Sequence, residues 1–439
     1  MVQDQLGHIF VANNHNLLEY DGERWRSHAA PNASIFRSVQ VNDSLVFTGQ
    51  YMEFGFWKRD IYGHMDYTSI SKKLDIPMVE DEEFWNIITV EDWVLFQSLD
   101  RIYSYHLKSE SFKVKDVRSN KAHIFKAGGT VYFQDDNLDL YKIAQGVTVP
   151  ILSKESLKNG TIVGLYPQKG TLLLIMDNGR FFRLENEKNL YGITGTDMDL
   201  AGINIYCSVR LADGTFMLGT ISKGVFQVSP WGKVIRIIDQ RNGLNNNTVL
   251  SLFQDRAQNL WLGLDNGISV LNMESPFNEY VDNLGRLGLV YTSKIVNGKL
   301  YLGTNQGLFV KDRGDASDFR LIQGTEGQVW TLAYLEGTLF CGHNKGTFTV
   351  DGEKARLIAP FPGTWSIKAI PGKPDQLLQG NYDGLSVLKK VKGQWAFSHV
   401  LEGFGISSRF LEVLDKDKIL INHEYKGLFE LMVDESFLK

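Results

Sequence analysis

The feature that most constrains the fold is a short turn motif that returns about every forty residues. In its clearest copy, Asn242 to Asp255 reads as a strand that ends in a polar turn. Asn259 to Ile268 then reads as a second strand, a tight turn and the start of a third strand. The tight turn recurs down the chain, and its copies close on Gly224, Gly267, Gly307, Gly346, Gly384 and Gly427. Successive glycines of this set are 38 to 43 residues apart.

A repeat of this length predicts a β-propeller, because about forty residues hold the four short strands and turns of one blade. A leucine-rich repeat is shorter. Helical repeats of similar length are excluded because no segment shows the apolar period of about 3.6 residues over about ten residues or more. Tight hairpin turns need a positive φ, which glycine adopts without steric cost. Abundant aromatic residues, 42 glycines and only 10 prolines are typical of the same all-β class.

The N-terminal half carries the same rhythm more weakly, with matching steps at 11–18, 48–57, 97–102, 133–138 and 175–180. Inner strands are predicted at 36–41, 85–90, 123–126, 162–166, 206–211, 249–253, 291–296, 329–334, 365–370 and 410–414. The first unit lacks an inner strand of its own, so the chain begins inside a blade, and about eleven four-stranded blades are expected. We expect a first propeller of about seven blades over residues 1–283, its first blade truncated. A second, incomplete propeller of about four blades follows over residues 284–439.

Charge and composition argue against several classes of function. The net charge is −5, and no block of Lys and Arg is long enough to grip phosphates, so nucleic-acid binding is not expected. No apolar run reaches the roughly 18 to 20 residues that cross a bilayer. The N-terminus reads as a turn and a strand rather than as a signal peptide. Cys207 and Cys341 lie in apolar, strand-like runs and are expected to be two buried thiols. No metal site and no cofactor are predicted.

The stretch from Leu244 to Gly263 resembles the two-component regulator propeller repeat. That repeat has the general form of a Gly-Leu pair, two polar residues, a valine, an aspartate, a turn glycine and a closing Trp-x-Gly-Thr. Asn259 stands here where the turn glycine is usual, and Leu264 stands where the threonine is usual. The copy is therefore good but imperfect.

Two further stretches look like one branch of that family: residues 49–57 with 67–70, and residues 407–410 with 422–428. The branch is the sensor region of Bacteroidetes membrane-anchored regulators. The resemblance implies a periplasmic sensor of fourteen blades, followed by a triple-tyrosine domain, a membrane helix and a helix-turn-helix or kinase output. Eleven blades would leave three missing, so we expect a truncated sensor segment. The expected partners are a small-molecule or oligosaccharide ligand and the downstream domains of the same receptor, with a homodimer left open.

Candidate ligand contacts lie at the starts of inner strands and in the turns between second and third strands, which gather on one face of a propeller. The strand-start positions are Arg37, Trp85, Trp330, Trp365 and Arg409. The turn positions and their neighbours are Tyr51, Glu53, Trp57, His343, Asn381, Tyr382, His423 and Tyr425. This mixture of aromatic, amide and charged side chains suits a sugar, because a flat aromatic face packs on the C–H face of a sugar ring.

Binding without catalysis is the expected function, and two other classes stay open. A glycosidase or lyase on a propeller would need paired carboxylates or a metal on one face. The turn from Asp255 to Trp261 is superficially similar to the aspartate box of sialidase-type propellers. Asp255 is more simply a turn residue whose carboxylate accepts backbone N–H groups, and Trp261 a core residue of the repeat. A protein-interaction scaffold, as in WD-repeat proteins, would present a broad surface without an enclosed pocket.

Overall fold

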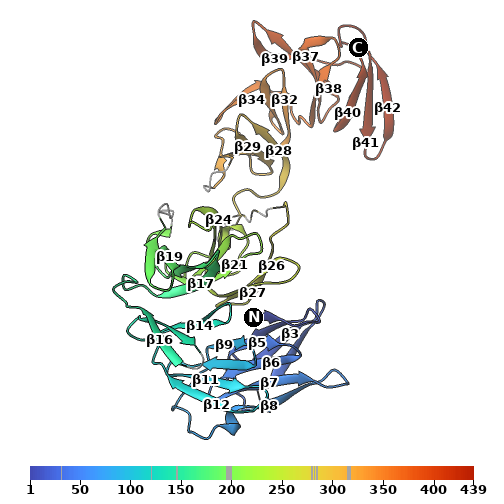
Figure 1. Cartoon of the computed structure of the whole chain (residues 1–439). Helices are drawn as coiled ribbons and strands as arrows, with labels where there is room; N and C mark the ends of the chain where they lie inside the picture. The colour runs from blue at the N-terminus through green and yellow to red at the C-terminus, as the bar shows by residue number, and fades with distance from the viewer. Residues whose placement is uncertain are drawn as a thin grey trace. The chain divides into compact units, whose positions relative to one another are not determined.

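The computed structural model describes residues 1–30, 32–119, 121–144, 147–193, 200–277, 280, 282, 285–313 and 318–439. These residues form eleven antiparallel sheets (Figure 1). In every sheet the strands pair in the order of the chain, each with its neighbour in sequence. The predicted all-β propeller fold is confirmed. The chain divides into two compact units, Met1–Val281 and Asp282–Lys439. The predicted domain boundary, between residues 283 and 284, lies outside the described residues.

The N-terminal unit contains seven sheets. The first four comprise β1 (Val2–Gln3), β2 (Ile9–Ala12), β3 (Asn16–Tyr20), β4 (Trp25–Ala29), β5 (Phe36–Asn42), β6 (Leu45–Gln50), β7 (Glu53–Arg59), β8 (Met65–Ser69), β9 (Asn86–Val90), β10 (Trp93–Gln97), β11 (Arg101–His106), β12 (Phe112–Asp116), β13 (Ile124–Ala127), β14 (Thr130–Gln134), β15 (Leu140–Ala144) and β16 (Val147–Leu152). The other three comprise β17 (Ile162–Gln168), β18 (Thr171–Met176), β19 (Phe181–Glu185), β20 (Asn189–Gly192), β21 (Ile205–Arg210), β22 (Phe216–Thr220), β23 (Val225–Val228), β24 (Val234–Ile238), β25 (Val249–Gln254), β26 (Asn259–Leu264) and β27 (Ile268–Asn272). Short 3-10 turns η1 (Ser71–Lys73) and η3 (Gln240–Asn242) connect some of these strands.

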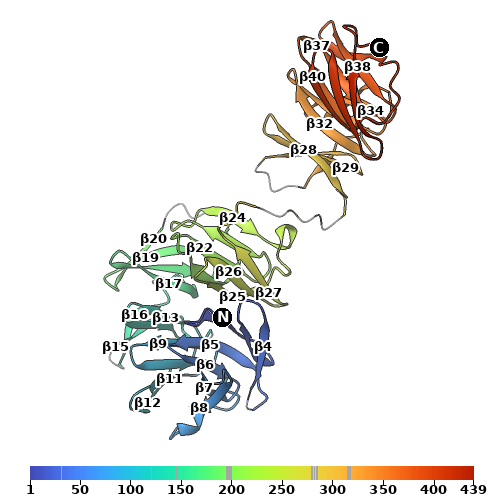
Figure 2. The same cartoon turned by 90° about the vertical axis from the view of Figure 1, so that its right-hand side faces the viewer.

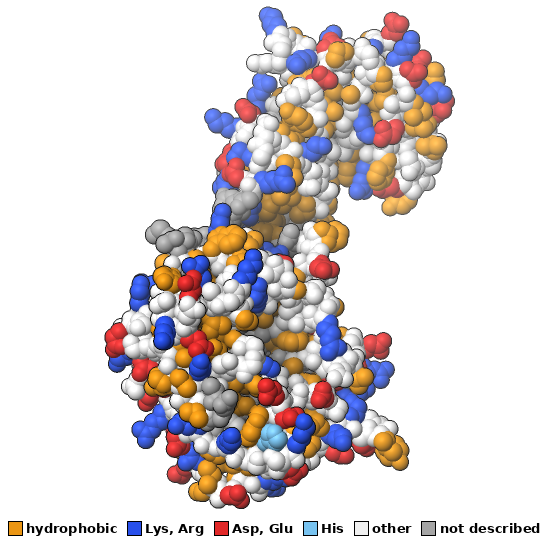
Figure 3. Space-filling model, viewed as in Figure 1, with side chains coloured by type: hydrophobic (Ala, Val, Ile, Leu, Met, Phe, Trp, Pro, Cys, Tyr) orange, Lys and Arg blue, Asp and Glu red, His pale blue; other side chains and the backbone are white. Residues whose placement is uncertain are grey.

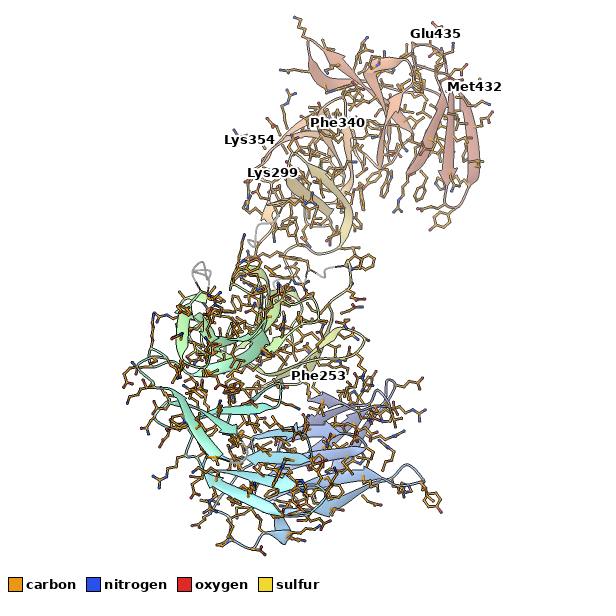
Figure 4. The ribbon with its side chains drawn as sticks, viewed as in Figure 1. Phe253, Lys299, Phe340, Lys354, Met432 and Glu435 are labelled. Atoms are coloured by element: carbon orange, nitrogen blue, oxygen red, sulfur yellow. The ribbon has the colours of Figure 1, made fainter. Side chains whose placement is uncertain are left out.

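The C-terminal unit contains four sheets. They comprise β28 (Val290–Val296), β29 (Lys299–Thr304), β30 (Leu308–Asp312), β31 (Arg320–Leu321), β32 (Val329–Leu335), β33 (Thr338–His343), β34 (Gly346–Asp351), β35 (Lys354–Ala359), β36 (Ser366–Ile370), β37 (Lys373–Gly380), β38 (Leu385–Val391), β39 (Gln394–Val400), β40 (Phe410–Asp415), β41 (Lys418–His423) and β42 (Gly427–Met432). Phe340 is fully buried between sheets, while Lys354 and Met432 are exposed (Figure 4).

The first strands of neighbouring sheets lie side by side, so they are the inner strands of the propeller. In the N-terminal unit, β5, β9, β13, β17, β21 and β25 each contact the next in this order. They gather around a common centre, with β4, β8 and β12 at the periphery (Figure 2). The expectation that the first blade lacks its inner strand is wrong, because Val2–Gln3 pairs with β2 and lies against β5. That strand is only two residues long, which is too short for a visible alternating pattern.

The N-terminal unit closes on itself through contacts between its first and seventh sheets. Trp261 of β26 packs in one buried cluster with Ile9 and Val11 of β2. The backbone N–H of Arg256 donates to the side-chain oxygen of Gln3 over 3.0 Å. These contacts join residues about 250 positions apart in the sequence. Through this long-range closure the first and seventh sheets pack against each other.

The repeat residues around this closure hold the turn between β25 and β26. One carboxylate oxygen of Asp255 accepts the backbone N–H of Asn259 at 2.8 Å. The other accepts the Trp261 indole N–H at 2.8 Å and the Asn259 amide at 3.1 Å. Asp255 is itself buried, so this turn carries a fully hydrogen-bonded carboxylate.

The six turn glycines named above all have positive φ values in the structure. Gly346 shows why glycine is required, since its φ is 134° and an added Cβ atom would lie 2.0 Å from the carbonyl oxygen of Ala359. The outer strand likewise approaches this turn at Gly224 and Gly307, whereas an added Cβ atom at Gly267 or Gly427 would meet no atom within 4 Å.

Candidate functional site

Six of the inner strands of the described residues begin with a pairing irregularity that sets one residue out of the ladder. The register of β28 with β29 skips Tyr291, and that of β32 with β33 skips Trp330. In the N-terminal unit the corresponding residues are Arg37, Val163, Tyr206 and Leu250. A β-bulge of this kind re-aims a side chain away from the regular sheet face.

Trp85 and Trp365 occupy the same place, just before their inner strands. The backbone N–H of Trp85 donates to the carbonyl of Gln97, and that of Trp365 donates to the carbonyl of Gly380. Arg409 precedes β40 in the same way. All five strand-start candidates from the sequence therefore lie at one equivalent position, at the same end of the inner strands.

In the C-terminal unit these positions form a continuous aromatic row, consisting of Tyr291, Trp330, Trp365 and Tyr382. The ring centroids of Tyr291 and Trp330 are 4.9 Å apart, and those of Trp330 and Trp365 are 4.5 Å apart. Tyr382, from the turn after β37, lies 5.2 Å from Trp365. Aromatic rings at such separations attract one another in addition to the stabilisation that comes from burying their apolar surface. The contacts between the rings therefore hold the row in place.

Tyr382 is fixed in this row from two sides. Its hydroxyl accepts the indole N–H of Trp330 over 2.9 Å. Its ring lies flat over Gly363, where an added Cβ atom would approach the ring to 2.0 Å. Only a residue without a side chain leaves this space for the tyrosine.

Arg409 brings a positive charge to the Trp365 ring of the row. Its guanidinium lies 5.0 Å from the centre of the Trp365 ring and 5.1 Å from that of Phe410. It is paired with Glu424 at 2.9 Å, and both side chains are about half exposed. A cation over an indole face is a stabilising contact that remains accessible to a ligand.

The row is partly open to solvent. Tyr291 is 39% exposed, while Trp330, Trp365 and Tyr382 are half-buried. Hydrophobic side chains reach the surface among charged ones on the face shown in Figure 3. The rings of the aromatic row are therefore ordered by their mutual contacts and still partly accessible to solvent.

The N-terminal unit brings together a smaller group around Arg37. Its guanidinium lies 4.4 Å from the centre of the Trp85 ring and pairs with Glu83 at 2.9 Å. Burial raises the pKa of Tyr206, and the nearby Arg37 charge opposes that rise. Tyr51 donates its hydroxyl to Asp81, on the chain segment that carries Glu83. This group consists mostly of charged and polar side chains, whereas the aromatic row is mostly apolar.

The structure places four sequence candidates inside the protein, where their side chains form hydrogen bonds with other residues. Glu53 accepts hydrogen bonds from Tyr67, Ser69 and Ser71, and Trp57 donates to Thr48 within the core. His343 contacts the carbonyl of Thr325 and accepts the backbone N–H of Lys345. Asn381 bonds to Thr364 and Ser386. The exposed fractions of Glu53, Trp57, His343 and Asn381 are 7%, 5%, 0% and 0%.

The last two candidates are His423, which ends β41, and Tyr425, which lies in the turn between β41 and β42. His423 accepts the backbone N–H groups of Tyr425 and Lys426 through its Nδ1 atom, which organises the turn. Tyr425 is 90% exposed and lies 6.2 Å from the His423 ring. Neither residue has a contact with the aromatic row among those of the described residues.

Sequence reasoning missed four residues that share the strand-start position: Val163, Tyr206, Leu250 and Tyr291. Each occurs in a predicted inner strand, so alignment of the repeats by their strand starts would have found them.

Among the described residues, no cluster of His, Cys, Asp and Glu is arranged to hold a metal ion. None of the described helices is long and apolar enough to cross a membrane. A shallow surface hollow lined by Thr338, Asp351 and Lys354 contains none of the candidates.

Comparison with known proteins places this geometry in context. Residues 243–266 match the family described as two component regulator propeller. The extracellular domain of the proposed hybrid two component system BT3049 from B. thetaiotaomicron matches with a TM-score of 0.63 and 15% identity. This match covers 98% of this chain and 62% of that one. The extracellular domain of the proposed one component system BT4673 from the same organism matches with a TM-score of 0.50 and 17% identity, over 100% and 64%. No curated protein matches the sequence.

This chain thus spans a little under two thirds of the length of those solved domains. At such low identity the likeness shows a shared fold. Residues 243–266 thus match the two component regulator propeller family, in a β-propeller chain that shares its fold with the extracellular domains of BT3049 and BT4673.

Proposed function

We propose that this chain is a ligand-binding sensor module of a bacterial signal-transduction regulator, and that the aromatic row binds an oligosaccharide without catalysing a reaction. The repeat at 243–266 and the fold shared with extracellular regulator domains support the sensor role. The row itself supports the choice of ligand. In this proposal the module lies in the periplasm and passes its signal to triple-tyrosine and output domains of the same receptor.

The observation that carries the proposal is the length and continuity of the row. Each of the four rings has a neighbour whose centroid is 4.5 to 5.2 Å away, and the Arg409 guanidinium lies over the Trp365 ring. A chain of sugar rings offers several apolar C–H faces in series, which a series of aromatic rings can cover. Arg409 and the Tyr382 hydroxyl add polar groups that can bond to sugar oxygens.

Signalling by this site follows from the strands that the row connects. Its residues come from β28, from the starts of β32 and β36, and from the turn after β37, so they belong to three adjacent sheets. Arg409 adds the fourth sheet. A ligand that contacts all of them binds best to one arrangement of the sheets, and that differential affinity shifts the population toward this arrangement.

The absence of catalysis is part of the proposal. Glycosidases use two carboxyl groups on either side of the scissile bond. Of the described residues, Glu424 is the one carboxylate paired with a member of this site, and it is occupied by Arg409. A site with one carboxylate, already paired with an arginine, is better suited to binding a sugar than to general acid and base catalysis of its hydrolysis.

Calorimetric titration of the whole chain against a panel of neutral and acidic oligosaccharides tests the proposal. We expect saturable binding to at least one glycan, and a loss of about tenfold or more in affinity for Trp330→Ala and for Trp365→Ala. Trp231→Ala is the matched control, because this tryptophan is 57% exposed in the other unit. Circular dichroism checks that each variant is folded. Absence of binding across the panel, or equal affinities for all variants, would contradict the proposal.

A further inference from the structure

Two aromatic rings hold the guanidinium of Arg409 in place. Its central carbon lies 5.0 Å from the centre of the Trp365 ring and 5.1 Å from the centre of the Phe410 ring. Trp365 precedes β36 and Phe410 begins β40, so the two rings belong to neighbouring sheets. Such contacts need no hydrogen bond from the guanidinium. The side chain is therefore positioned while its hydrogen-bond donors stay available.

Most of those donors have no partner in the protein. A guanidinium carries five N–H groups. Among the described residues, the single hydrogen bond of Arg409 runs from its Nη1 atom to Glu424 Oε1, over 2.9 Å, and the same contact is its ion pair. The Nε and Nη2 groups therefore have no protein acceptor in the described part of the chain.

Arg37 of the N-terminal unit forms a more enclosed pair. It also lies over an indole, that of Trp85, but both its Nε and its Nη2 atom donate to Glu83, over 3.1 and 2.9 Å. The Arg37 and Glu83 side chains are 25% and 21% exposed. The two side chains of the Arg409 pair are 50% and 45% exposed. Of these two arginines, Arg409 is the one whose charge is open to a ligand.

Glu424 can leave Arg409 when a ligand binds. It lies in the turn between β41 and β42, and within the described residues its carboxylate bonds to Arg409 alone. The turn is held by His423, whose Nδ1 atom accepts the backbone N–H groups of Tyr425 and Lys426. Ion pairs between exposed side chains contribute about 1 kcal/mol or less. A ligand carboxylate can therefore replace Glu424 without disturbing the turn.

A carboxylate on a sugar fits the surroundings of this arginine. The two oxygens of a carboxylate accept two parallel N–H bonds from a guanidinium, which is a stronger contact than a bond to a neutral hydroxyl. Trp365 also contacts Trp330 and Tyr382, so a sugar ring that binds to the row lies beside Arg409. Uronic acids combine both features, because they carry a carboxylate directly on a sugar ring.

We propose that Arg409 makes the aromatic row selective for acidic oligosaccharides, by binding the carboxylate of a uronic acid residue. This inference rests on the proposed function, and it adds the charge of the ligand and the residue that recognises this charge. The guanidinium exchanges Glu424 for the ligand carboxylate, while the aromatic rings cover the apolar faces of the sugars.

Matched pairs of glycans test the proposal. Calorimetry with the whole chain compares oligogalacturonate and oligoglucuronate with their carboxyl-reduced counterparts, which keep the same linkages. We expect at least one acidic member to bind about tenfold or more tightly than its counterpart, because hydrogen bonds to a charged group are lost on reduction. Raising the salt concentration should reduce this preference.

Three variants assign the preference to Arg409. Arg409→Gln should lower the affinity for the acidic member by about tenfold and leave that for its counterpart unchanged. Glu424→Gln should raise the affinity for the acidic member by about two- to fivefold, because it removes a competing carboxylate. Arg356→Gln is the matched control, because Arg356 is an exposed arginine on β35 of the same unit, and it should keep the preference. Circular dichroism checks that each variant is folded.

The outcomes separate this inference from the proposed function. If both members of each pair bind equally, or if Arg409→Gln keeps the preference, selection by Arg409 is wrong and oligosaccharide binding by the row still stands. If no glycan binds, the proposed function fails and this inference fails with it. Tighter binding of sulfated neutral glycans than of uronates would overturn the assignment of the carboxylate.

Discussion

The indole N–H of Trp330 donates to the hydroxyl of Tyr382 over 2.9 Å. This bond joins the start of an inner strand to the turn between second and third strands of the next sheet. It is thus a direct link between the two kinds of position from which a propeller builds a binding surface.

Tyr382→Phe removes this bond and leaves the ring in place. We expect the variant to lower the stability of the C-terminal unit by about 1 kcal/mol, the net worth of one hydrogen bond. Urea unfolding followed by tryptophan fluorescence measures the change, because Trp330 reports directly on its surroundings. A variant that unfolds at the same urea concentration, with an unchanged emission spectrum, would show that the bond does not hold the row.

Gly346→Ala is expected to be far more damaging than an ordinary turn substitution. At φ 134° only glycine is free of strain, and the new Cβ atom would lie 2.0 Å from the carbonyl oxygen of Ala359. We expect a loss of about 3 kcal/mol or more in the free energy of unfolding. Gly372→Ala is the matched control, because its φ is also positive, at 77°, and no atom lies within 4 Å of the added carbon. It should cost only about 1 kcal/mol. Equal costs would remove the close approach as the reason for glycine.

The inner strands could be predicted from the sequence because apolar alternation and a glycine turn fix both ends of a hairpin. For example, the predicted strand at 329–334 is β32, Val329–Leu335, and that at 249–253 is β25, Val249–Gln254. The strand Val2–Gln3 was missed because two residues carry no period.

Whether a turn side chain is buried or exposed to solvent could not be predicted from the sequence with the same success. A polar residue at a strand end, such as His343 or Asn381, has the same sequence signature whether it faces water or bonds inside the protein. The structure buries both, because Thr325, Thr364 and Ser386 supply their partners from neighbouring strands. Conversely, Tyr291 resembles a core residue in the sequence, and only its place in a bulge turns it toward the row.

The reactivity of the two cysteines tests whether the strands that carry them are buried. Both are free thiols, and burial raises the pKa of Cys207 to about 12 and raises that of Cys341 further. The reactive thiolate is therefore scarce at pH 8. We expect a chromogenic disulfide reagent to label neither thiol in the native chain and both in the unfolded chain. Rapid labelling under native conditions would contradict the burial of these strands.

Glu19 is the centre of a buried charge cluster that joins the first two sheets of the N-terminal unit. Its carboxylate is 2.8 Å from His8 Nδ1 and 2.8 Å from His28 Nε2, and it also pairs with Arg59 of β7. Arg26 lies 4.0 Å away. Burial acts to raise the pKa of Glu19, but the hydrogen bonds from His28 and Arg59 outweigh it and lower the pKa from 4.5 to about 2.

The stability of the N-terminal unit should therefore depend on pH in acid. Between about pH 4.5 and pH 2 the unfolded chain binds a proton at Glu19 and the folded chain does not, so stability falls as the pH drops through this window. Glu19→Gln should remove this part of the acid dependence and lower stability at pH 7, because Arg59 loses a buried partner. Urea unfolding at pH 7, 4.5 and 3 measures both effects, with the exposed Glu23→Gln of the same sheet as control. If Glu19→Gln keeps the full acid dependence of the parent chain, the carboxylate does not stabilise this junction through its charge.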